Sequence, residues 1–254
     1  MDQDRFKFKL LVKETRLNEQ HIIGTCFCLQ VIQVNDSTVI VSALYSLLVD
    51  SSGTELDKIM DCYPTIKYVD DGVEKSEIQN KYFLMYNEAK VQRSKEDIVE
   101  ERKWRKWVDE ELVHSLSPNV YRTPSEALAA FQWFSKVGCW EDIFSAWERN
   151  LVIYMGAGVM WLLSKRLKKR HNLKDDVRQS LYDQCNFWMK TLSKKGTPFL
   201  GGSSPNLADL AVFGALTAVE GCEAFQDARN NTKIGDWFDG MKAAVTKREG
   251  SSIL

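Results

Sequence analysis

The hydrophobic pattern of the chain changes near residues 85–95. From Ser94 onward, apolar residues recur every three or four positions, which is the spacing of amphipathic helices. Helices are predicted at 96–115, 142–169, 175–193, 207–220 and 234–247. The first carries its apolar side chains on one face, at Trp104, Trp107, Val108, Leu112 and Val113. The Ser117-Pro118-Asn119 triplet predicts where that helix ends.

Two short motifs predict helix starts in this half of the chain. In Thr123-Pro124-Ser125-Glu126, the threonine is a cap, the proline suits the first helical position and the glutamate reaches back. In Asn206-Leu207-Ala208-Asp209, the Asn206 cap and Asp209 three positions later form a capping box. Such a box satisfies N–H groups that a helix start leaves without partners, so its predicted role is structural.

The pattern before residue 90 is that of a small α/β piece. Strand-like alternation occurs at 6–12, and 28–34 is a second predicted strand. Residues 39–48 carry apolar side chains at helical spacing behind Asp36 or Ser37, either of which can cap a helix. Asp71-Gly72 predicts a turn or hairpin within 66–75. We therefore expect an α+β fold, with an incomplete α/β domain over 1–90 and an all-helical domain over 91–254.

Composition places the chain among folded globular proteins. Of its 254 residues, 44% are hydrophobic, which is enough to bury a proper core. The formal net charge is −1, so no global field recruits nucleic acid or an anionic membrane. The six cysteines are scattered, and residues 1–10 hold no apolar segment of signal-peptide type. Reduced thiols in a cytoplasmic or peripherally membrane-associated protein are therefore expected.

The longest apolar run, 151–163, is followed by a strongly basic segment. The run is shorter than the roughly 20 residues that span a bilayer, so a buried core helix is expected. The basic segment, 165–170, is either a solvated face at a helix end or an anion clamp. In the clamp, Arg166 and Arg170 lie four residues apart and hold ligand carboxylates, such as those of an acidic lipid or a porphyrin. Contact of the same segment with a membrane surface is a lesser alternative.

Six strings carry a resemblance to a known family. They are 35–44, 103–110, Ser117-Pro118-Asn119-Val120-Tyr121-Arg122-Thr123-Pro124, 154–157, 164–171 and 205–212. With them, about 35–247 resembles the microsomal prostaglandin E synthase type 2 family of glutathione-transferase-like proteins. The resemblance implies a thioredoxin-like N-terminal domain, incomplete here, and a helical glutathione-transferase-like C-terminal domain. It also implies isomerisation of the endoperoxide prostaglandin H2 to prostaglandin E2.

The resemblance further implies ligands and partners. Asp36 and Ser37 match the pair that holds the γ-glutamyl end of glutathione, a role that stands beside helix capping. The family's haem or acidic-ligand cleft is matched by His114, Ser117, Arg166 and Arg170. A lone histidine on a mostly apolar helix is also typical of a buried core. The implied cofactors are glutathione and haem, and the implied substrate is a lipid endoperoxide. A homodimer with peripheral membrane contact is implied, and no metal site or nucleic-acid partner is predicted.

The chain departs from the family's pattern in its N-terminal half. The family carries Cys-Pro-Phe-Cys, whereas these 254 residues contain no Cys-x-x-Cys and no proline before Pro64. Cys26 and Cys28 are the remaining candidates for catalytic thiols. One intervening residue would place both on the same face of a strand, without the helix N-terminus or the cation that activates a thiolate. We therefore expect structural thiols here and weak or absent isomerase activity.

The alternative is a non-catalytic module. The helical half keeps the basic residues that would hold an acidic lipid or haem without turnover. Its aromatic residues are dense enough for a packed or dimer-forming surface. These residues are Phe131, Trp133, Phe134, Trp140, Phe144 and Trp147.

Overall fold

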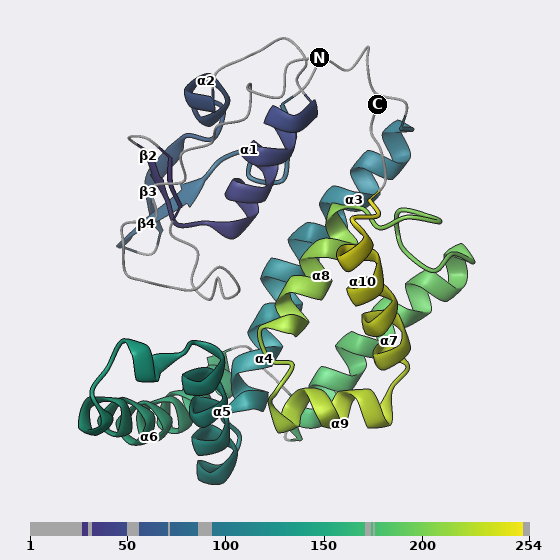
Figure 1. Ribbon diagram of the computed structural model, residues 1–254. Helices are drawn as coiled ribbons and strands as arrows, with labels where there is room; N and C mark the ends of the chain where they lie inside the picture. The colour runs from purple at the N-terminus through teal and green to yellow at the C-terminus, as the bar shows by residue number, and fades with distance from the viewer. Residues whose placement is uncertain are drawn as a thin grey trace. The chain divides into compact units, whose positions relative to one another are not determined.

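The computed structural model describes residues 27–29, 32–49, 56–70, 72–85, 93–170, 174 and 176–250. The chain divides into two compact units, and the boundary between them falls between Arg93 and Ser94. Helices make up most of the described residues, together with small antiparallel sheets of two strands (Figure 1). The predicted α+β class is therefore confirmed.

The N-terminal unit contains two short hairpins. In the first, β1 (Phe27–Leu29) pairs antiparallel with β2 (Ile32–Val34). The single strand predicted at 28–34 is therefore wrong, because two residues separate strands that pair with each other, as in the shortest common hairpins. The second, β3 (Thr65–Asp70) with β4 (Val73–Ile78), is the predicted hairpin. The strand predicted at 6–12 lies outside the described residues.

Helix α1 (Ser37–Val49) supplies most of the small core of this unit, and α2 (Leu56–Met60) covers one end of it. The buried apolar side chains of this core are Val34, Val39, Ile40, Ala43, Ile59 and Tyr63. The Tyr63 hydroxyl donates to the carbonyl oxygen of Phe83 at 2.8 Å. That bond attaches the segment after β4 to the core, so the described part of the unit packs around α1.

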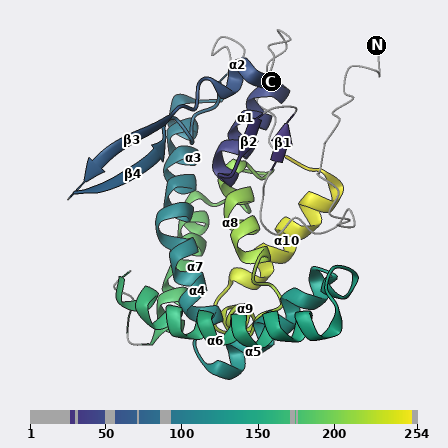
Figure 2. The ribbon, with the colours of Figure 1, turned by 90° about the vertical axis from the view of Figure 1, so that its left-hand side faces the viewer.

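The C-terminal unit is helical throughout. Its elements are α3 (Lys95–Trp107), a π-helical segment η3 (Val108–Leu112), α4 (Val113–Val120), α5 (Pro124–Val137), a 3₁₀ turn η4 (Trp140–Asp142), α6 (Ala146–Arg170), α7 (Val177–Lys195), α8 (Leu207–Thr217), α9 (Glu223–Asn231) and α10 (Ile234–Lys247). The predicted helices are all present, and α9 was not predicted. Figure 2 shows α5 and α6 lying across one end of α4, α7 and α9.

Pro118 lies inside α4 and does not end it. The predicted break at Ser117-Pro118-Asn119 is therefore wrong. The Asn119 amide donates to the carbonyl oxygens of Ser115 and Val177, each at 2.8 Å, and so supports the turn in which proline removes a backbone donor.

The wider turn of η3 also shifts the helical register. As a result Val113 is exposed, against the prediction that it shares the buried face of Trp104.

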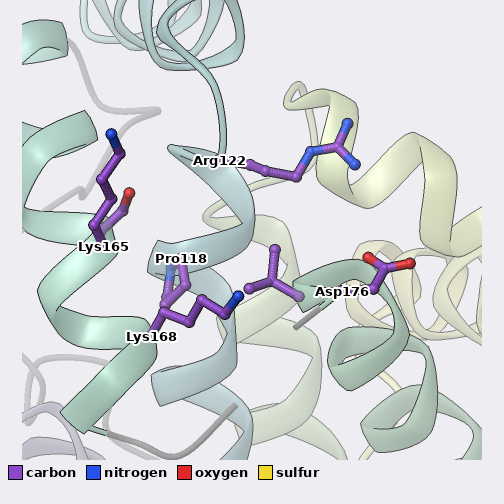
Figure 3. Close-up of a pocket in the computed structure, with 7 residues that line it drawn as sticks. Pro118, Arg122, Lys165, Lys168 and Asp176 are labelled. Carbon is purple, nitrogen blue, oxygen red and sulfur yellow. The ribbon is translucent and has the colours of Figure 1, made fainter. Parts of the chain in front are cut away.

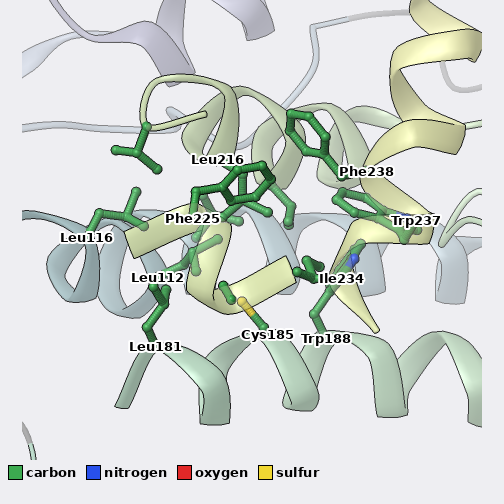
Figure 4. Packing of buried hydrophobic residues seen from close by; sticks show 14 of the residues in the cluster. Leu112, Leu116, Leu181, Cys185, Trp188, Leu216, Phe225, Ile234, Trp237 and Phe238 are labelled. Carbon is green, nitrogen blue, oxygen red and sulfur yellow. The ribbon is translucent and has the colours of Figure 1, made fainter. Parts of the chain in front are cut away.

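The main core centres on tryptophan rings. Trp188 is fully buried, and its ring centroid lies 5.2 Å from that of Trp104 and 5.5 Å from that of Trp237. Figure 4 shows side chains from α4, α7, α9 and α10 meeting around Cys185 and Trp188. Such edge-on aromatic contacts add to the free energy gained from burial, so this cluster is the structural centre of the unit.

Helix α6 is not the buried core helix predicted at 151–163. Three of its 25 residues are buried: Ile153, Ala157 and Ser164. The outer side of the apolar run faces solvent because α5 and α4 cover only part of the helix. Among the described residues, none of the helices is both long enough and apolar enough to pass through a bilayer.

Candidate functional site

One contact fixes the basic end of α6 against the end of α4. The buried Ser164 hydroxyl oxygen lies 2.9 Å from the carbonyl oxygen of Tyr121 and 2.8 Å from that of Trp161. Because Ser164 is held there, the next turn of α6 runs alongside Pro118. The side chains of Lys165 and Lys168 are therefore directed by a buried contact on the same helix.

These elements enclose a pocket of about 240 Å³. Its lining is Pro118, Arg122, Ser164, Lys165, Lys168, Asp176 and Val177 (Figure 3). Figure 3 shows the Lys168 side chain extending from α6 toward the side of the pocket that carries Asp176. The Lys165 ammonium lies 3.9 Å from the centroid of the Trp161 ring, a cation–π contact. Three cations therefore surround an apolar wall, a combination suited to an anion with a hydrocarbon part.

An ionic network centred on the buried side chains of Glu126 and Arg178 lies behind this pocket. Arg122 donates to Glu126, with its Nε 2.9 Å and its Nη2 2.6 Å from Oε1, and this hydrogen bond is the main reason that the pKa of Arg122 is raised. Glu126 Oε2 accepts from Arg178 at 3.1 Å, and Arg178 also donates to Asp227 at 2.8 Å and to the carbonyl oxygen of Asn119 at 2.8 Å. The network connects α4, α5, α7 and α9 and holds Arg122 beside the pocket.

Glu126 does not complete the predicted helix start. Thr123 caps α5 as predicted, because its hydroxyl accepts from the Glu126 N–H at 3.2 Å, with Pro124 at the first helical turn. The Glu126 carboxylate, however, binds Arg122 and Arg178 and does not reach back to the cap. Two guanidinium donors, of which Arg178 is buried, are stronger partners for a carboxylate than one backbone N–H.

The predicted anion clamp and the observed pocket use different residues of one segment. Arg166 and Arg170 are exposed on α6 and do not line the pocket, whereas Lys165 and Lys168 do. Neighbouring residues of a helix point in different directions, so only the packing of Ser164 determines which cations turn inward. Sequence spacing could indicate the segment, but it could not indicate its face.

The residues matched to the family's haem cleft are not gathered in the pocket. His114 is exposed on α4, so the alternative that it belongs to the core is wrong. Ser117 is half-buried on the same helix and is also outside the pocket lining. In the part of the chain that the structure describes, no three His, Cys, Asp or Glu side chains lie close enough together to hold a metal ion.

The residues matched to the glutathione site stand at the start of α1. Asp36 Oδ1 accepts from the Val39 N–H at 3.0 Å, so Asp36 caps this helix. Its Oδ2 lies 3.9 Å from Nζ of Lys81, and Ser37 is exposed as the first residue of α1. Cys28 lies in β1, and Cys26 lies outside the described residues.

Asn206 and Asp209 form a reciprocal capping box at the start of α8. The buried Asp209 carboxylate accepts the N–H groups of Leu200 at 2.9 Å, Gly201 at 3.0 Å and Asn206 at 3.0 Å. Its pKa is raised, mainly by burial, although these three donors act in the opposite direction. All its partners are backbone groups of the same unit, so the geometry here is that of a folding device.

A wider depression of about 530 Å³ lies on α3 and α7. It is lined by Lys95, Glu96, Val99, Glu100, Lys103, Trp104 and Thr191. Its two lysines and two glutamates balance in charge, so it does not favour a ligand of either sign. The basic pocket is therefore the stronger candidate site.

Comparison with known proteins places the chain among named relatives. No protein-family model matches it. A mouse (Mus musculus) protein named prostaglandin E synthase 2 is 48% identical over 217 residues, which are 84% of this chain and 55% of the relative. A zebrafish (Danio rerio) protein of the same name is 44% identical over 218 residues, 84% of this chain and 56% of the relative. The chain thus spans about half the length of the curated relatives it matches. The resemblance found in the sequence is confirmed: over 84% of its length, this chain is a homologue of proteins named prostaglandin E synthase 2.

Proposed function

We propose that this chain binds a carboxylate-bearing lipid of the prostaglandin endoperoxide class, with the carboxylate in the basic pocket of the helical unit. The observation that carries the proposal is the pocket lining, in which Lys165, Lys168 and Arg122 surround the apolar side chains of Pro118 and Val177. The relatives' shared name supports the class of lipid. The cationic and apolar lining of the pocket supports binding of the lipid through its carboxylate.

The volume of the pocket limits what enters it. At about 240 Å³, the pocket is smaller than the roughly 300–1,000 Å³ of sites that enclose a whole drug-sized ligand. It therefore takes the charged head of a lipid and leaves the hydrocarbon part outside. The Asp176 carboxylate at the pocket edge repels a second negative charge, so a single carboxylate fits better than a phosphate dianion.

Matched double variants on α6 test this binding mode. In Lys165→Gln/Lys168→Gln, two charges leave the pocket; in Arg166→Gln/Arg170→Gln, two charges leave the same helix outside it. Calorimetric titration with a stable endoperoxide analogue should show a loss of affinity of about 10-fold or more in the lysine variant, since a charged hydrogen bond is worth about 1.5–3 kcal/mol. The arginine variant should bind like the unmodified chain.

The methyl ester of the same analogue is the ligand control, because it lacks the negative charge. Equal binding of ester and acid would show that the pocket does not recognise the carboxylate. A loss confined to the arginine variant would move the site to the outer face of α6 and contradict the proposal.

We also propose that Asp36 and Ser37 bind the γ-glutamyl end of glutathione, as the resemblance implies. In support, both residues stand at the N-terminus of a 13-residue helix, where N–H groups favour a carboxylate, and Asp36 can attract an ammonium group. Asp36→Asn separates the two roles, because asparagine caps helices as well as aspartate but carries no charge. Glutathione at about 100 times its dissociation constant should stabilise the chain by about 2.7 kcal/mol, and Asp36→Asn should abolish that gain. An equal gain in the variant would contradict the assignment.

Haem does not fit the described residues as a single site. His114, Ser117, Arg166 and Arg170 lie outside the pocket, and a cavity of about 240 Å³ does not enclose a porphyrin. We therefore assign no step to haem. The four residues remain a prediction from the resemblance.

We propose that isomerase turnover by this chain is weak. The reaction breaks the O–O bond, removes one carbon-bound proton to form a ketone and protonates the other oxygen to a hydroxyl, so reactant and product are isomers. General acid–base catalysis alone accelerates a reaction by about 10²–10⁴-fold. These 254 residues contain no Cys-x-x-Cys that could supply a paired thiol. Turnover should fall far below that of a family member with Cys-Pro-Phe-Cys. Equal turnover by the two proteins would contradict this proposal.

A further inference from the structure

Helix α6 is covered on only part of its circumference, and its open part carries a row of aromatic rings. On the covered side, Gly156 packs closely: an added Cβ would lie 2.3 Å from the Phe131 ring. Elsewhere on the helix an aromatic residue recurs every seven positions, at Trp147, Tyr154 and Trp161, which we call the aromatic row. Seven residues are close to two helical turns, so the three rings lie along one side of α6. Trp147 is 68% and Tyr154 62% exposed, so the row faces solvent.

The aromatic row leads into the basic pocket. Lys168, which lines the pocket, stands seven residues beyond Trp161 and so continues the row (Figure 3). Lys165 also lines the pocket, and its ammonium lies 3.9 Å from the centroid of the Trp161 ring. A cation of the pocket therefore contacts the nearest ring of the row. The cationic pocket and the aromatic row form one continuous surface along α6.

We propose that the aromatic row holds the unbranched hydrocarbon chain of a long-chain carboxylate whose head lies in the basic pocket. The pocket is too small for a whole lipid, and the row is the apolar surface that begins at its edge. Gly158 lies between Tyr154 and Trp161, and an added Cβ there would meet no atom within 4 Å, so the path between the two rings is open. Methylene groups that lie on these rings leave water, which favours binding. The inference rests on the proposed function, because the pocket must hold the carboxylate.

The helix sets a length scale for the bound chain. An α-helix rises about 1.5 Å per residue, so Tyr154 lies about 16.5 Å and Trp147 about 27 Å from Lys165 along the axis. An extended hydrocarbon chain advances about 1.25 Å per carbon, given a C–C bond of about 1.52 Å. From a carboxylate held at Lys165, about 13 carbons reach Tyr154 and about 22 reach Trp147. Octanoate therefore ends before Tyr154, whereas hexadecanoate passes it.

Calorimetric titration of the full chain with these two acids, below the concentrations at which they aggregate, tests the inference. Full burial of a methylene strengthens binding by about four-fold, so contact on one side should give about two-fold. Hexadecanoate should therefore bind at least about 30-fold more tightly than octanoate, through five or more methylenes in contact with the row.

Matched substitutions on α6 locate the chain. Tyr154→Ser removes the middle ring of the aromatic row, and Met155→Ser removes a neighbouring side chain that is equally exposed, at 60%, on another side of the helix. Neither change takes a side chain out of the core. Tyr154→Ser should weaken hexadecanoate binding by about 5-fold or more and leave octanoate binding unchanged, since the lost ring contacts only the longer chain. Met155→Ser should bind both acids like the unmodified chain, and Tyr154→Phe, which keeps the ring, should do the same.

Three outcomes would overturn the inference: equal affinity for the two acids, equal losses in Tyr154→Ser and Met155→Ser, or a Tyr154→Ser variant that loses both acids equally. Failure of the proposed function has a different signature, since Lys165→Gln/Lys168→Gln would then bind octanoate as tightly as the unmodified chain does. If that variant loses octanoate while the unmodified chain binds hexadecanoate no more tightly than octanoate, the pocket holds the carboxylate and the aromatic row does not hold the chain.

Discussion

Replacing Arg178 with Gln removes the central cation of the ionic network. The Arg178 side chain is 4% exposed and makes hydrogen bonds to Glu126, Asp227 and the backbone of Asn119. Glutamine is too short and has too few donors to replace this fork of contacts. Glu126 keeps Arg122, whereas Asp227 and the Asn119 carbonyl oxygen lose a partner.

The magnitude follows from burial. Removing one partner of a buried ion pair costs about 3–5 kcal/mol. The lower end applies to Arg178, because Glu126 keeps Arg122 and the Asp227 side chain is 34% exposed. The matched control is Arg229→Gln, which breaks the Arg229–Asp239 pair, where the side chains are 30% and 57% exposed. A solvent-screened pair contributes about 0–1 kcal/mol. We therefore expect Arg178→Gln to cost at least 2 kcal/mol more than Arg229→Gln, roughly the gap between these two ranges.

Urea unfolding followed by tryptophan fluorescence measures this difference. All eight tryptophans lie between residues 104 and 237, so the signal reports the helical unit alone. With a slope of about 2–3 kcal/mol per molar urea, a loss of about 3 kcal/mol should lower the midpoint of Arg178→Gln by about 1–1.5 M. Equal midpoints for Arg178→Gln and Arg229→Gln would refute the view that the network stabilises the packing of α4, α5, α7 and α9.

Three further outcomes are expected. Gly156→Ala should be less stable than the control Gly214→Ala by about 1–3 kcal/mol in the same urea assay, because only its Cβ collides with a ring; equal stabilities would contradict the packing of α6 on α5. Asp209→Asn should lower the free energy of unfolding by about 1–3 kcal/mol, because the new amide would place a donor against backbone donors. A variant that unfolds at the same temperature as the unmodified chain would contradict this. Burial raises the pKa of Cys185 to about 12 and that of Cys222 to about 11, so iodoacetamide at pH 8 should label them only after unfolding, as mass spectrometry of peptides can check. Labelling of either thiol in the folded chain would show that it is accessible.

The sequence alone was sufficient wherever a few neighbouring residues decide the structure. Thr123 with Pro124, and Asn206 with Asp209, predict helix starts because a cap and its N–H partners are within three residues of each other. Asp71-Gly72 predicts the turn of a hairpin for the same local reason. In the structure Gly72 has a φ of 75°, which glycine adopts without strain. The basic segment 165–170 could be recognised as a candidate anion site from its composition.

Tertiary structure decided the features that depend on residues far apart in the chain. Arg178 meets Glu126 across 52 residues, and no local pattern indicates that pairing. The contact between Ser164 and Tyr121 turns Lys165 and Lys168 into the pocket and leaves Arg166 outside it. An apolar run has the same sequence signature whether one side of it or its whole circumference is covered. The exposure of α6 therefore depended on how much of it α4 and α5 cover, because burial is a property of the packed chain.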